Sequence, residues 1–438
     1  MDDFGEDLQI LRYIYRDAVK KIGPQAYAQA ALHAFAQSPS SVTKRAAYMS
    51  IRDLTLTAGY SVTLSHWQSP SYDSSIYDEA GTRSGRITAN VNDYTRDQHE
   101  LANRYGQHFI ASYIRHLPTV RVHAYATSSG MAAYTTALMA IIGSSAHLGL
   151  PILAGKQSYF QNKAILTALC GKRLVWIDES RTDAVIAQIQ ALHPAAVCID
   201  TIGNTPSIHV ADVISIWNYI RKSIKNDIWF LVDHTCAGPT VQFLKDMIVP
   251  PSFARLLVVE SLNKHHQFGL DRVTGGIVWG VGKGVDQLYY YRNHGGTIIS
   301  DVSAAALPTP NRRIFDLYHK RLIRNTALLV ELLRRYLPSS YILSYPPEGV
   351  DTAVLPAFCT ITARKSTAAD WRRRIRMIIA RARKQHIPLV AGSSFGLWTT
   401  RIYTVAANTQ YEYPFFRIAP GMETAEEIRA IARIIDFK

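Results

Sequence analysis

The segment VVESLNKHHQFGLDRVTGGIVWG, from Val258 to Gly280, is the most informative part of the chain about its fold. It continues an apolar run, LLVVE, that predicts a buried β-strand, and it ends in IVWG, which predicts a second strand. A polar segment with Lys264 lies between them, and Gly275 and Gly276 mark the turn into the second strand. Lys264 therefore lies just past a strand end, where a single lysine is usually an ordinary surface charge.

Two segments upstream carry groups that complement this lysine. LVDHTCAGP completes an apolar strand that ends in Asp233, and HAYATSSGMAAYTTALMA predicts a strand, a turn at Ser128, Ser129 and Gly130, and a helix. A lysine amine, a strand-end carboxylate and a helix N-terminus that can hold a phosphate are the groups that pyridoxal phosphate requires. The sequence therefore predicts a pyridoxal phosphate site.

These segments, with others between Tyr94 and Glu423, occur in the order found in fold-type I pyridoxal-phosphate enzymes, and the chain resembles their Cys/Met metabolism family, the cystathionine γ-synthase-like group. The resemblance implies an α/β architecture with a mainly parallel, seven-stranded-type sheet and a smaller C-terminal α+β domain. Strands that alternate with helices in mid-chain also indicate an α/β domain. We expect a helical N-terminal extension at 1–65, a large cofactor-binding domain at 66–305 and the smaller domain at 306–438.

Composition fits a globular protein of two or three domains. The chain has 438 residues, of which 47% are hydrophobic and 19% charged, which argues against disorder. Four scattered cysteines without a CxxC pair indicate free thiols in a reducing compartment, and MDDFGEDLQI lacks the features of a secretory signal, so we expect a cytoplasmic protein. Between Arg121 and Lys156 no residue is charged, but turn motifs divide this stretch, which indicates buried core and not a membrane span.

The formal net charge of +14 would attract anionic partners, including nucleic acid. The densest basic cluster is WRRRIRMIIARARKQH, at residues 371–386. Its apolar residues recur at helical spacing, at Trp371, Ile375, Ile378 and Ile379. This pattern predicts an amphipathic helix with a solvated arginine face and does not favour a nucleic-acid partner.

The N-terminal region is predicted to be helical, with LQILRYIYRDAVKKI and YAQAALHAFAQ as helices and SPSS as a break. The pattern assigns no role to these helices. Residues 66–93 are rich in Ser, Tyr, Gly and Asp and predict a loop, which the resemblance implies crosses to a partner subunit. The resemblance further implies a homodimer or homotetramer with shared active sites.

The resemblance places the cofactor phosphate among small residues and an arginine. Tyr94 and Arg96 match a Tyr-x-Arg motif that reaches the phosphate of the neighbouring subunit, although an exposed helix start is the ordinary alternative. The remaining phosphate contacts it implies are Ser129, Gly130, Met131 and Ser261.

The ring of the cofactor is assigned in the same way. Tyr159 would stack on it, or simply pack a strand end, and Asn204 would bond its phenolic oxygen. Asp233 would pair with the pyridine nitrogen and keep it protonated. The chain departs from the family pattern in several places: Asp200 stands where glutamate is usual, residues 160–162 (Phe-Gln-Asn) replace Gly-Gly-Thr, and His265 and His266 follow Lys264 where an aromatic residue is common.

Lys264 is then the amine that holds the cofactor as an imine and serves as general base. Arg417, on an apolar strand, would bind the substrate α-carboxylate, and Ser394 matches a substrate-binding serine. His265 and His266 are either additional acid–base groups or a packed pair, and their spacing predicts no metal site.

The predicted activity is γ-replacement or γ-elimination on an amino acid with a leaving group such as a thioether, an activated homoserine ester or a sulfonium, with Lys264 and Tyr159 as proton-transfer groups. A specialised biosynthetic pathway is a further possibility, because of the departures after Tyr159 and Lys264. Two alternatives remain open: β-elimination or transamination, and an inactive relative that binds a cofactor or nucleic acid.

Overall fold

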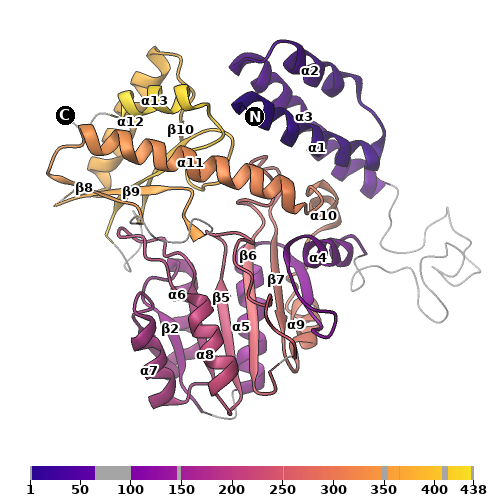
Figure 1. Cartoon of the computed structure of the whole chain (residues 1–438), viewed down its shortest axis with the longest axis vertical. Helices are drawn as coiled ribbons and strands as arrows, with labels where there is room; N and C mark the ends of the chain where they lie inside the picture. The colour runs from indigo at the N-terminus through magenta and orange to yellow at the C-terminus, as the bar shows by residue number, and fades with distance from the viewer. Residues whose placement is uncertain are drawn as a thin grey trace, which may run out of the picture.

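The computed structural model describes residues 2–64, 100–145, 149–249, 251–346, 354–364, 366–406 and 413–435. Within these residues the chain forms a large sheet, a smaller second sheet and a layer of N-terminal helices (Figure 1). The predicted loop at 66–93, with Tyr94 and Arg96, lies outside the described residues.

The large sheet has seven strands in the order β1-β7-β6-β5-β4-β2-β3. They are β1 (His123–Thr127), β2 (Ile152–Gly155), β3 (Leu174–Ile177), β4 (Ala196–Asp200), β5 (Ile228–Asp233), β6 (Ala254–Ser261) and β7 (Gly276–Val281). Strand β7 is antiparallel to both of its neighbours, whereas the other strand pairs described in this sheet are parallel. The predicted α/β fold with a mainly parallel sheet is confirmed.

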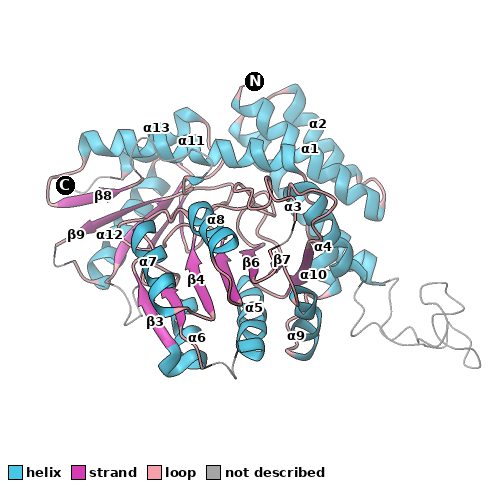
Figure 2. Cartoon of the chain, turned by 60° about the horizontal axis from the view of Figure 1, so that its bottom comes forward, coloured by secondary structure: helices cyan, strands magenta, loops and turns pink. Residues whose placement is uncertain are grey.

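Helices cover both faces of this sheet (Figure 2). They are α4 (Glu100–Tyr113), α7 (Thr182–Leu192) and α8 (Val213–Ser223) on one face, and α5 (Gly130–Ser145), α6 (Phe160–Cys170) and α9 (Leu288–His294) on the other. Along β6, Leu256 and Val258 pack into the first core, and Leu257 and Val259 into the second. Because both faces of β6 are covered, its sequence is a continuous apolar run instead of an alternating one.

The second sheet has the strand order β10-β11-β12-β9-β8. Its strands are β8 (Tyr341–Ser344), β9 (Cys359–Ala363), β10 (Val390–Ala391), β11 (Arg401–Val405) and β12 (Phe415–Ala419). The helices α11 (Arg312–Tyr336), α12 (Ala368–Lys384) and α13 (Ala425–Ile434) contribute to its core. The predicted change to long helices and short strands after residue 306 therefore occurs in the structure.

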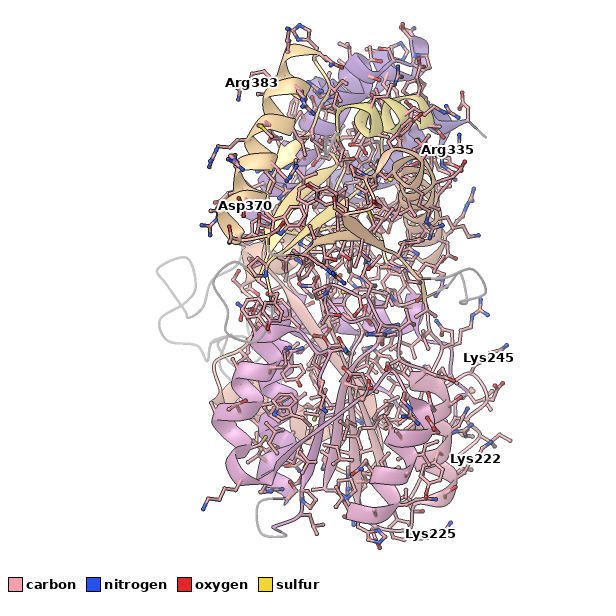
Figure 3. The ribbon with its side chains drawn as sticks, turned by 90° about the vertical axis from the view of Figure 1, so that its left-hand side faces the viewer. Lys222, Lys225, Lys245, Arg335, Asp370 and Arg383 are labelled. Carbon is pink, nitrogen blue, oxygen red and sulfur yellow. The ribbon has the colours of Figure 1, made fainter. Side chains whose placement is uncertain are left out.

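Helix α12 has the predicted amphipathic character. Trp371, Ile375 and Ile378 are buried against the second sheet, and a capping box between Thr367 and Asp370 fixes the start of the helix. Figure 3 shows the outward direction of charged side chains, such as Arg383 on α12 and Lys222 and Lys225 at the opposite end of the molecule. Much of the positive charge is therefore spread over exposed surface.

The N-terminal region forms α1 (Asp3–Ile22), α2 (Ala26–Gln37) and α3 (Ser41–Leu64), as the helical periodicity predicts. Asp2 caps α1 by accepting the Gly5 N–H at 2.8 Å, and Gly23, at φ +80°, ends it. These helices pack on each other, on α11 and on the short α10 (Asp301–Ala306).

The uncharged stretch between Arg121 and Lys156 contains β1, α5 and β2, which are largely buried in the large sheet and its covering helices. Within the described ranges, none of the helices combines the length and apolar character that a membrane crossing requires.

Candidate active site

A cavity of about 500 Å³ lies at the carboxyl ends of β4, β5 and β6, beside the N-terminus of α5. These strands end at Asp200, Asp233 and Ser261, and all three residues line the cavity. Tyr403 on β11 and Arg417 on β12 supply the wall from the second sheet. Ligands of α/β proteins characteristically bind at this edge of the sheet.

Lys264 lies in the turn after β6 and lines the cavity. Its Nζ donates to Ser394 Oγ at 2.8 Å and lies 5.2 Å from the centre of the Phe395 ring. Burial, followed by the positive charge of Arg417, lowers the pKa of the Lys264 amine to about 8. Because a neutral amine is the nucleophilic and basic form, this environment suits a lysine that reacts near neutral pH.

Ser394 connects the two cations of the site. Its hydroxyl faces Lys264, and its carbonyl oxygen accepts from Arg417 Nη2 at 3.3 Å. Its backbone has φ +82°, which is uncommon for a residue with a side chain. The sequence predicted Ser394 as a substrate-binding residue, and the structure brings it to the lysine amine.

Asp200 and Asp233 form a carboxylate pair on adjacent strands, where they are register partners of β4 and β5. The buried Asn162 lies between them: its Nδ2 donates to Asp233 Oδ2 at 2.8 Å and lies 3.5 Å from Asp200 Oδ1. Burial raises the pKa of both carboxyl groups, and it raises that of Asp200 well above the usual range for an aspartate. The negative charge of Asp233 raises the pKa of Asp200 further. One proton shared by the pair is therefore favoured over two ionised carboxylates.

The start of α5 forms a cradle for an anion. In its first turn the backbone N–H groups of Gly130 and Met131 have no intrahelical acceptor, and Ser129 Oγ accepts the Ala132 N–H at 3.0 Å. A Cβ on Gly130 would come within 2.7 Å of Ser261 Cβ, so glycine permits the close approach of β6. The structure thus brings the predicted phosphate contacts Ser129, Gly130, Met131 and Ser261 to one place.

Arg417 and Asn204, which the sequence predicts for different roles, are in contact. Arg417 Nη1 donates to Asn204 Oδ1 at 3.0 Å, and the guanidinium lies 5.5 Å from the Phe358 ring and 5.6 Å from the Phe395 ring. Because the amide oxygen of Asn204 is used by Arg417, its amide nitrogen is the group able to donate to a cofactor oxygen.

Tyr159 lies at the start of α6, and its backbone N–H donates to Asp200 Oδ2 at 2.9 Å. Its ring lines the cavity and contacts Phe160 edge to face, with ring centroids 4.8 Å apart. Burial raises the pKa of the Tyr159 phenol, against the opposing effect of Arg417, so the phenol keeps its proton at neutral pH. Tyr159 can therefore donate a proton or stack on a ring.

These residues fit pyridoxal phosphate. The amine of Lys264, the carboxylate of Asp233 and the anion cradle at Ser129 and Gly130 surround one cavity. The amine suits the carbonyl carbon of the cofactor, the carboxylate suits its ring nitrogen, and the cradle suits its phosphate.

The sequence did not identify several residues of the cavity. They are Thr235, Cys236, Phe395, Tyr403 and Val405. Thr235 and Phe395 are close in sequence to Asp233 and Ser394, and this proximity was the available signal. Thr235 donates its N–H to Asp233 Oδ1 at 3.0 Å, and its Oγ1 accepts the N–H of Ser261 at 3.0 Å.

His265 and His266 are packed and do not line the cavity. His266 Nε2 lies 2.8 Å from Glu260 Oε2, and His265 is in edge-to-face contact with His319, with ring centroids 5.1 Å apart. Burial lowers the pKa of His265 well below its usual range, so its ring is neutral. Among the residues that the structure places, no cluster of three or more His, Cys, Asp or Glu could hold a metal ion.

Solved structures with the same fold include cystathionine γ-synthase from Xanthomonas oryzae pv. oryzae in complex with cystathionine, with 19% sequence identity, a TM-score of 0.62 and coverage of 94% of this chain and 99% of that chain. Another is cystathionine γ-lyase from Lactobacillus plantarum complexed with L-serine, with 17% identity, a TM-score of 0.60 and coverage of 84% and 92%. At these identities the likeness establishes the fold.

A curated relative, the bifunctional enzyme flvA of Aspergillus flavus, is 24% identical over 317 residues, which are 70% of this chain and 38% of that protein. The matched part is therefore well under half of that relative's length. The sequence model of a family described as Cys/Met metabolism PLP-dependent enzyme matches residues 56–309, more than half of the chain. This chain therefore belongs to the Cys/Met metabolism family of pyridoxal-phosphate-dependent enzymes.

Proposed function

We propose that this enzyme catalyses γ-replacement or γ-elimination on an amino acid with a leaving group at Cγ. The observation that carries the proposal is the shared contact at Ser394, whose hydroxyl bonds Lys264 and whose carbonyl oxygen bonds Arg417. A base with a lowered pKa and a cation that can bind a carboxylate are thereby held beside each other in one cavity. This is the pair of groups that α-proton removal from an amino acid requires.

The bound cofactor supplies an electron sink for the substrate α-carbon. In the proposed reaction Arg417 binds the substrate carboxylate, and Lys264 in its neutral form removes the proton from Cα. Lys264 then carries protons between Cα and Cβ, and the protonated Tyr159 is positioned to donate to the leaving group. Asp233 keeps a negative charge at the ring nitrogen, with Asn162 as its buried hydrogen-bond donor.

The proposed substrates carry a thioether, an activated homoserine ester or a sulfonium at Cγ. A cavity of about 500 Å³ falls within the usual range for sites that take a small-molecule ligand. Phe160 and Gln161 line it beside Tyr159, where the family pattern has glycines. Larger side chains there support a substrate other than that of ordinary transsulfuration and a role in a specialised biosynthetic pathway.

We also propose a homodimer or homotetramer in which Tyr94 and Arg96 complete the phosphate site of the neighbouring subunit. Mixing Lys264→Ala subunits with Arg96→Ala subunits tests this arrangement. If sites are shared, each variant alone is inactive and the mixture regains activity; a mixture that stays inactive after subunit exchange contradicts it.

The reaction type is tested by incubating the purified holoenzyme with a panel of amino acids in deuterated water and following the label by mass spectrometry. Loss of the γ-substituent with deuterium at Cβ is the expected result, and Cα is labelled as well where the product is an amino acid, as in γ-replacement. Loss of a β-substituent, or a 2-oxo acid that keeps its γ-substituent, would replace the proposal with β-elimination or transamination. The Lys264→Ala variant is the control, and it should give no label at either carbon.

A further inference from the structure

Helix α3 of the N-terminal layer contacts the backbone that follows Lys264. Tyr48 Oη donates to the carbonyl oxygen of Gly269 at 3.1 Å. Arg52 donates from Nε to the carbonyl oxygen of Leu270 at 2.8 Å and from Nη2 to that of Asp271 at 3.3 Å. Two side chains of α3 thus hold three consecutive carbonyl groups shortly after the lysine.

Trp398 links this turn to the loop that carries Ser394. Its indole stacks on the Tyr48 ring, with centroids 5.0 Å apart and planes at 27°, and its Nε1 donates to the carbonyl oxygen of Phe268 at 2.6 Å. Gly269, at φ +81°, makes room for it, because a Cβ there would lie 2.3 Å from Trp398 Cδ1. A displacement of Trp398 would therefore move both loops that hold the lysine amine.

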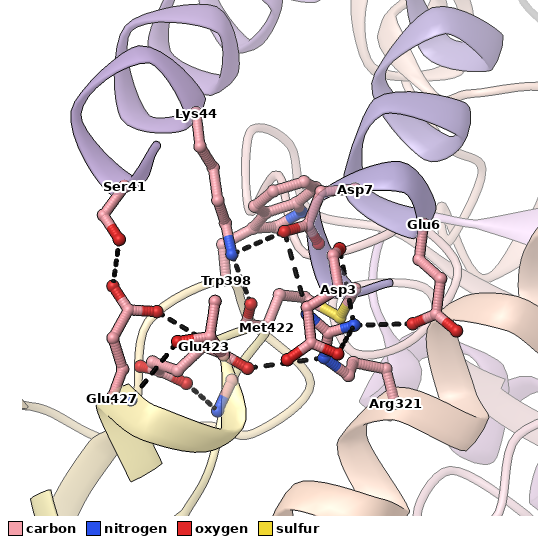
Figure 4. A network of polar contacts seen from close by, with 12 residues as sticks. Asp3, Glu6, Asp7, Ser41, Lys44, Arg321, Trp398, Met422, Glu423 and Glu427 are labelled. Carbon is pink, nitrogen blue, oxygen red and sulfur yellow. Dashed lines mark hydrogen bonds and ion pairs between the residues drawn. The ribbon is translucent and has the colours of Figure 1, made fainter. Parts of the chain in front are cut away.

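The N-terminal helices are anchored beside Trp398 by a buried polar network (Figure 4). Lys44 Nζ lies 2.7 Å from Asp7 Oδ2, donates to the carbonyl oxygen of Met422 and lies 5.5 Å from the centre of the Trp398 ring. Asp7 has no exposed surface, and Arg321 on α11 lies 3.8 Å from the same carboxylate. A buried charge network of this kind fixes the register of the helices, because a shift would leave charges unpaired.

Both loops contain backbone conformations that need outside support. Ser394 has φ +82°, and Phe268 and Asp271 each have φ +48°. Such conformations each cost about 1–3 kcal/mol and persist where neighbouring groups restrain them. The contacts from Tyr48 and Arg52 lie next to Phe268 and on Asp271.

We propose that the N-terminal helices are a positioning element for Lys264, with Tyr48 and Arg52 of α3 acting through Trp398 and the Phe268–Asp271 turn. This inference rests on the proposed role of Lys264 and adds a function for the N-terminal extension. The hydrogen bonds of Tyr48 and Arg52 described above end on residues that do not line the cavity. These two side chains therefore act through the loops and not on the substrate.

The Lys264 amine reports on this positioning. Burial contributes most to its low pKa, and the charged or titratable groups that influence it include Arg417, Cys236, Asp271 and Arg401, with the buried, neutral His265 as a further neighbour. If the loops loosen, water reaches the amine and its pKa rises from about 8 toward the usual lysine value. A rise of one unit would lower the neutral fraction at pH 8 about fivefold.

The test compares Tyr48→Ala with two other variants of the full-length protein. The first measurement is the reactivity of the Lys264 amine as a function of pH, followed by competitive acylation and mass spectrometry before cofactor is added. The second is hydrogen exchange at residues 264–272 and 393–400 in the holoenzyme. Tyr48→Ala should lower labelling of Lys264 at pH 8 about fivefold and speed exchange in both loops. Tyr48→Phe keeps the ring on Trp398 and should restore most of the labelling.

Leu54→Ala is the matched control, because Leu54 is fully buried on the same helix and packs with Ala18, Ala28 and Ala58. It should lower the melting temperature and leave the pKa of Lys264 unchanged. If Tyr48→Ala does no more than Leu54→Ala, the N-terminal helices have only a structural role and the inference fails. Turnover retained by Lys264→Ala would instead remove the proposed function, while the labelling still reports whether α3 positions the amine.

Discussion

The cavity has two ends that are built differently. At the carboxylate end, Asp200 and Asp233 terminate adjacent parallel strands, so the regular register of the sheet sets their separation. At the lysine end, Lys264 is held by the Ser394 loop, which itself contacts Arg417, Trp398 and the N-terminal helices. The first arrangement depends on local sheet geometry, whereas the second depends on segments that are far apart in the sequence. We expect substitutions at the two ends to differ in which property of the enzyme they change and in how much they change it.

The largest effect is expected at the lysine end. Lys264→Ala should lower kcat by about 10²–10⁴-fold or more, because it removes the general base. Thermal stability should be unchanged or slightly higher, since the substitution also removes a buried amine whose charge is disfavoured. Single-turnover kinetics and a melting curve check the two parts, and retention of near-normal turnover would overturn the assignment.

At the carboxylate end the two aspartates should differ. Asp233→Asn should lower kcat/KM by about 10²–10³-fold, the size expected when one partner of a buried ion pair is lost. Asp200→Asn should cost less than about tenfold, because Asp200 accepts the backbone N–H of Tyr159, whereas Asp233 is the carboxylate assigned to the ring nitrogen. Steady-state kinetics measures both losses. Equal losses in the two variants would show that the negative charge of the pair is not held by Asp233 alone.

Arg417→Met should raise KM by about 10–100-fold, the equivalent of losing a hydrogen-bonded contact to a charged carboxylate. It should also raise the pKa of Lys264, because the positive charge of Arg417 helps to lower it. The kinetic profile against pH checks both effects. An increase in KM without a pKa change would mean that burial alone sets the lysine pKa.

The pH dependence of the wild-type enzyme follows from the lysine end. Protonated Lys264 cannot accept the α-proton, so kcat, which reports on the complex in which the substrate has freed the amine, should rise by about fivefold from pH 7 to pH 8 and level off above the pKa of about 8. The activity is thus lost as pH falls. A profile that is flat from pH 7 to pH 9 would contradict the role of a free amine in the limiting step.

The last expected effect is on stability and concerns Glu179, a buried carboxyl group close to Asp200. Burial raises its pKa to about 7, so the folded state favours the protonated form and loses stability as pH rises from about 4.5 to about 7. Glu179→Gln keeps an acceptor for the Gln157 N–H and should raise the free energy of unfolding at pH 8 by about 1–3 kcal/mol. At pH 4.5 the difference should disappear; urea titrations at both pH values measure it.

At both ends of the cavity the sequence predicts the strand-end residues better than the contacts that hold them, for a physical reason. Apolar runs mark the strands, and polar residues at their ends must meet at one edge of a parallel sheet, which located Asp233, Ser261 and Lys264. No local sequence pattern predicts that Tyr48 stacks on Trp398 or that the Asn162 amide lies between two aspartates. Such contacts depend on the final packing of distant segments, and the sequence accordingly assigned no role to the N-terminal helices.

The connection of Lys44 to Met422 has a consequence for the order of folding. The two residues are 378 positions apart, and Arg321, the other cation beside Asp7, also lies late in the chain. During synthesis the N-terminal helices are made before the residues they contact. Their contacts beside Trp398 can form only after nearly all of this sequence has been made. The loops around Lys264, and with them the capacity to hold the cofactor, therefore become fully ordered only after the segment through Met422 has been made.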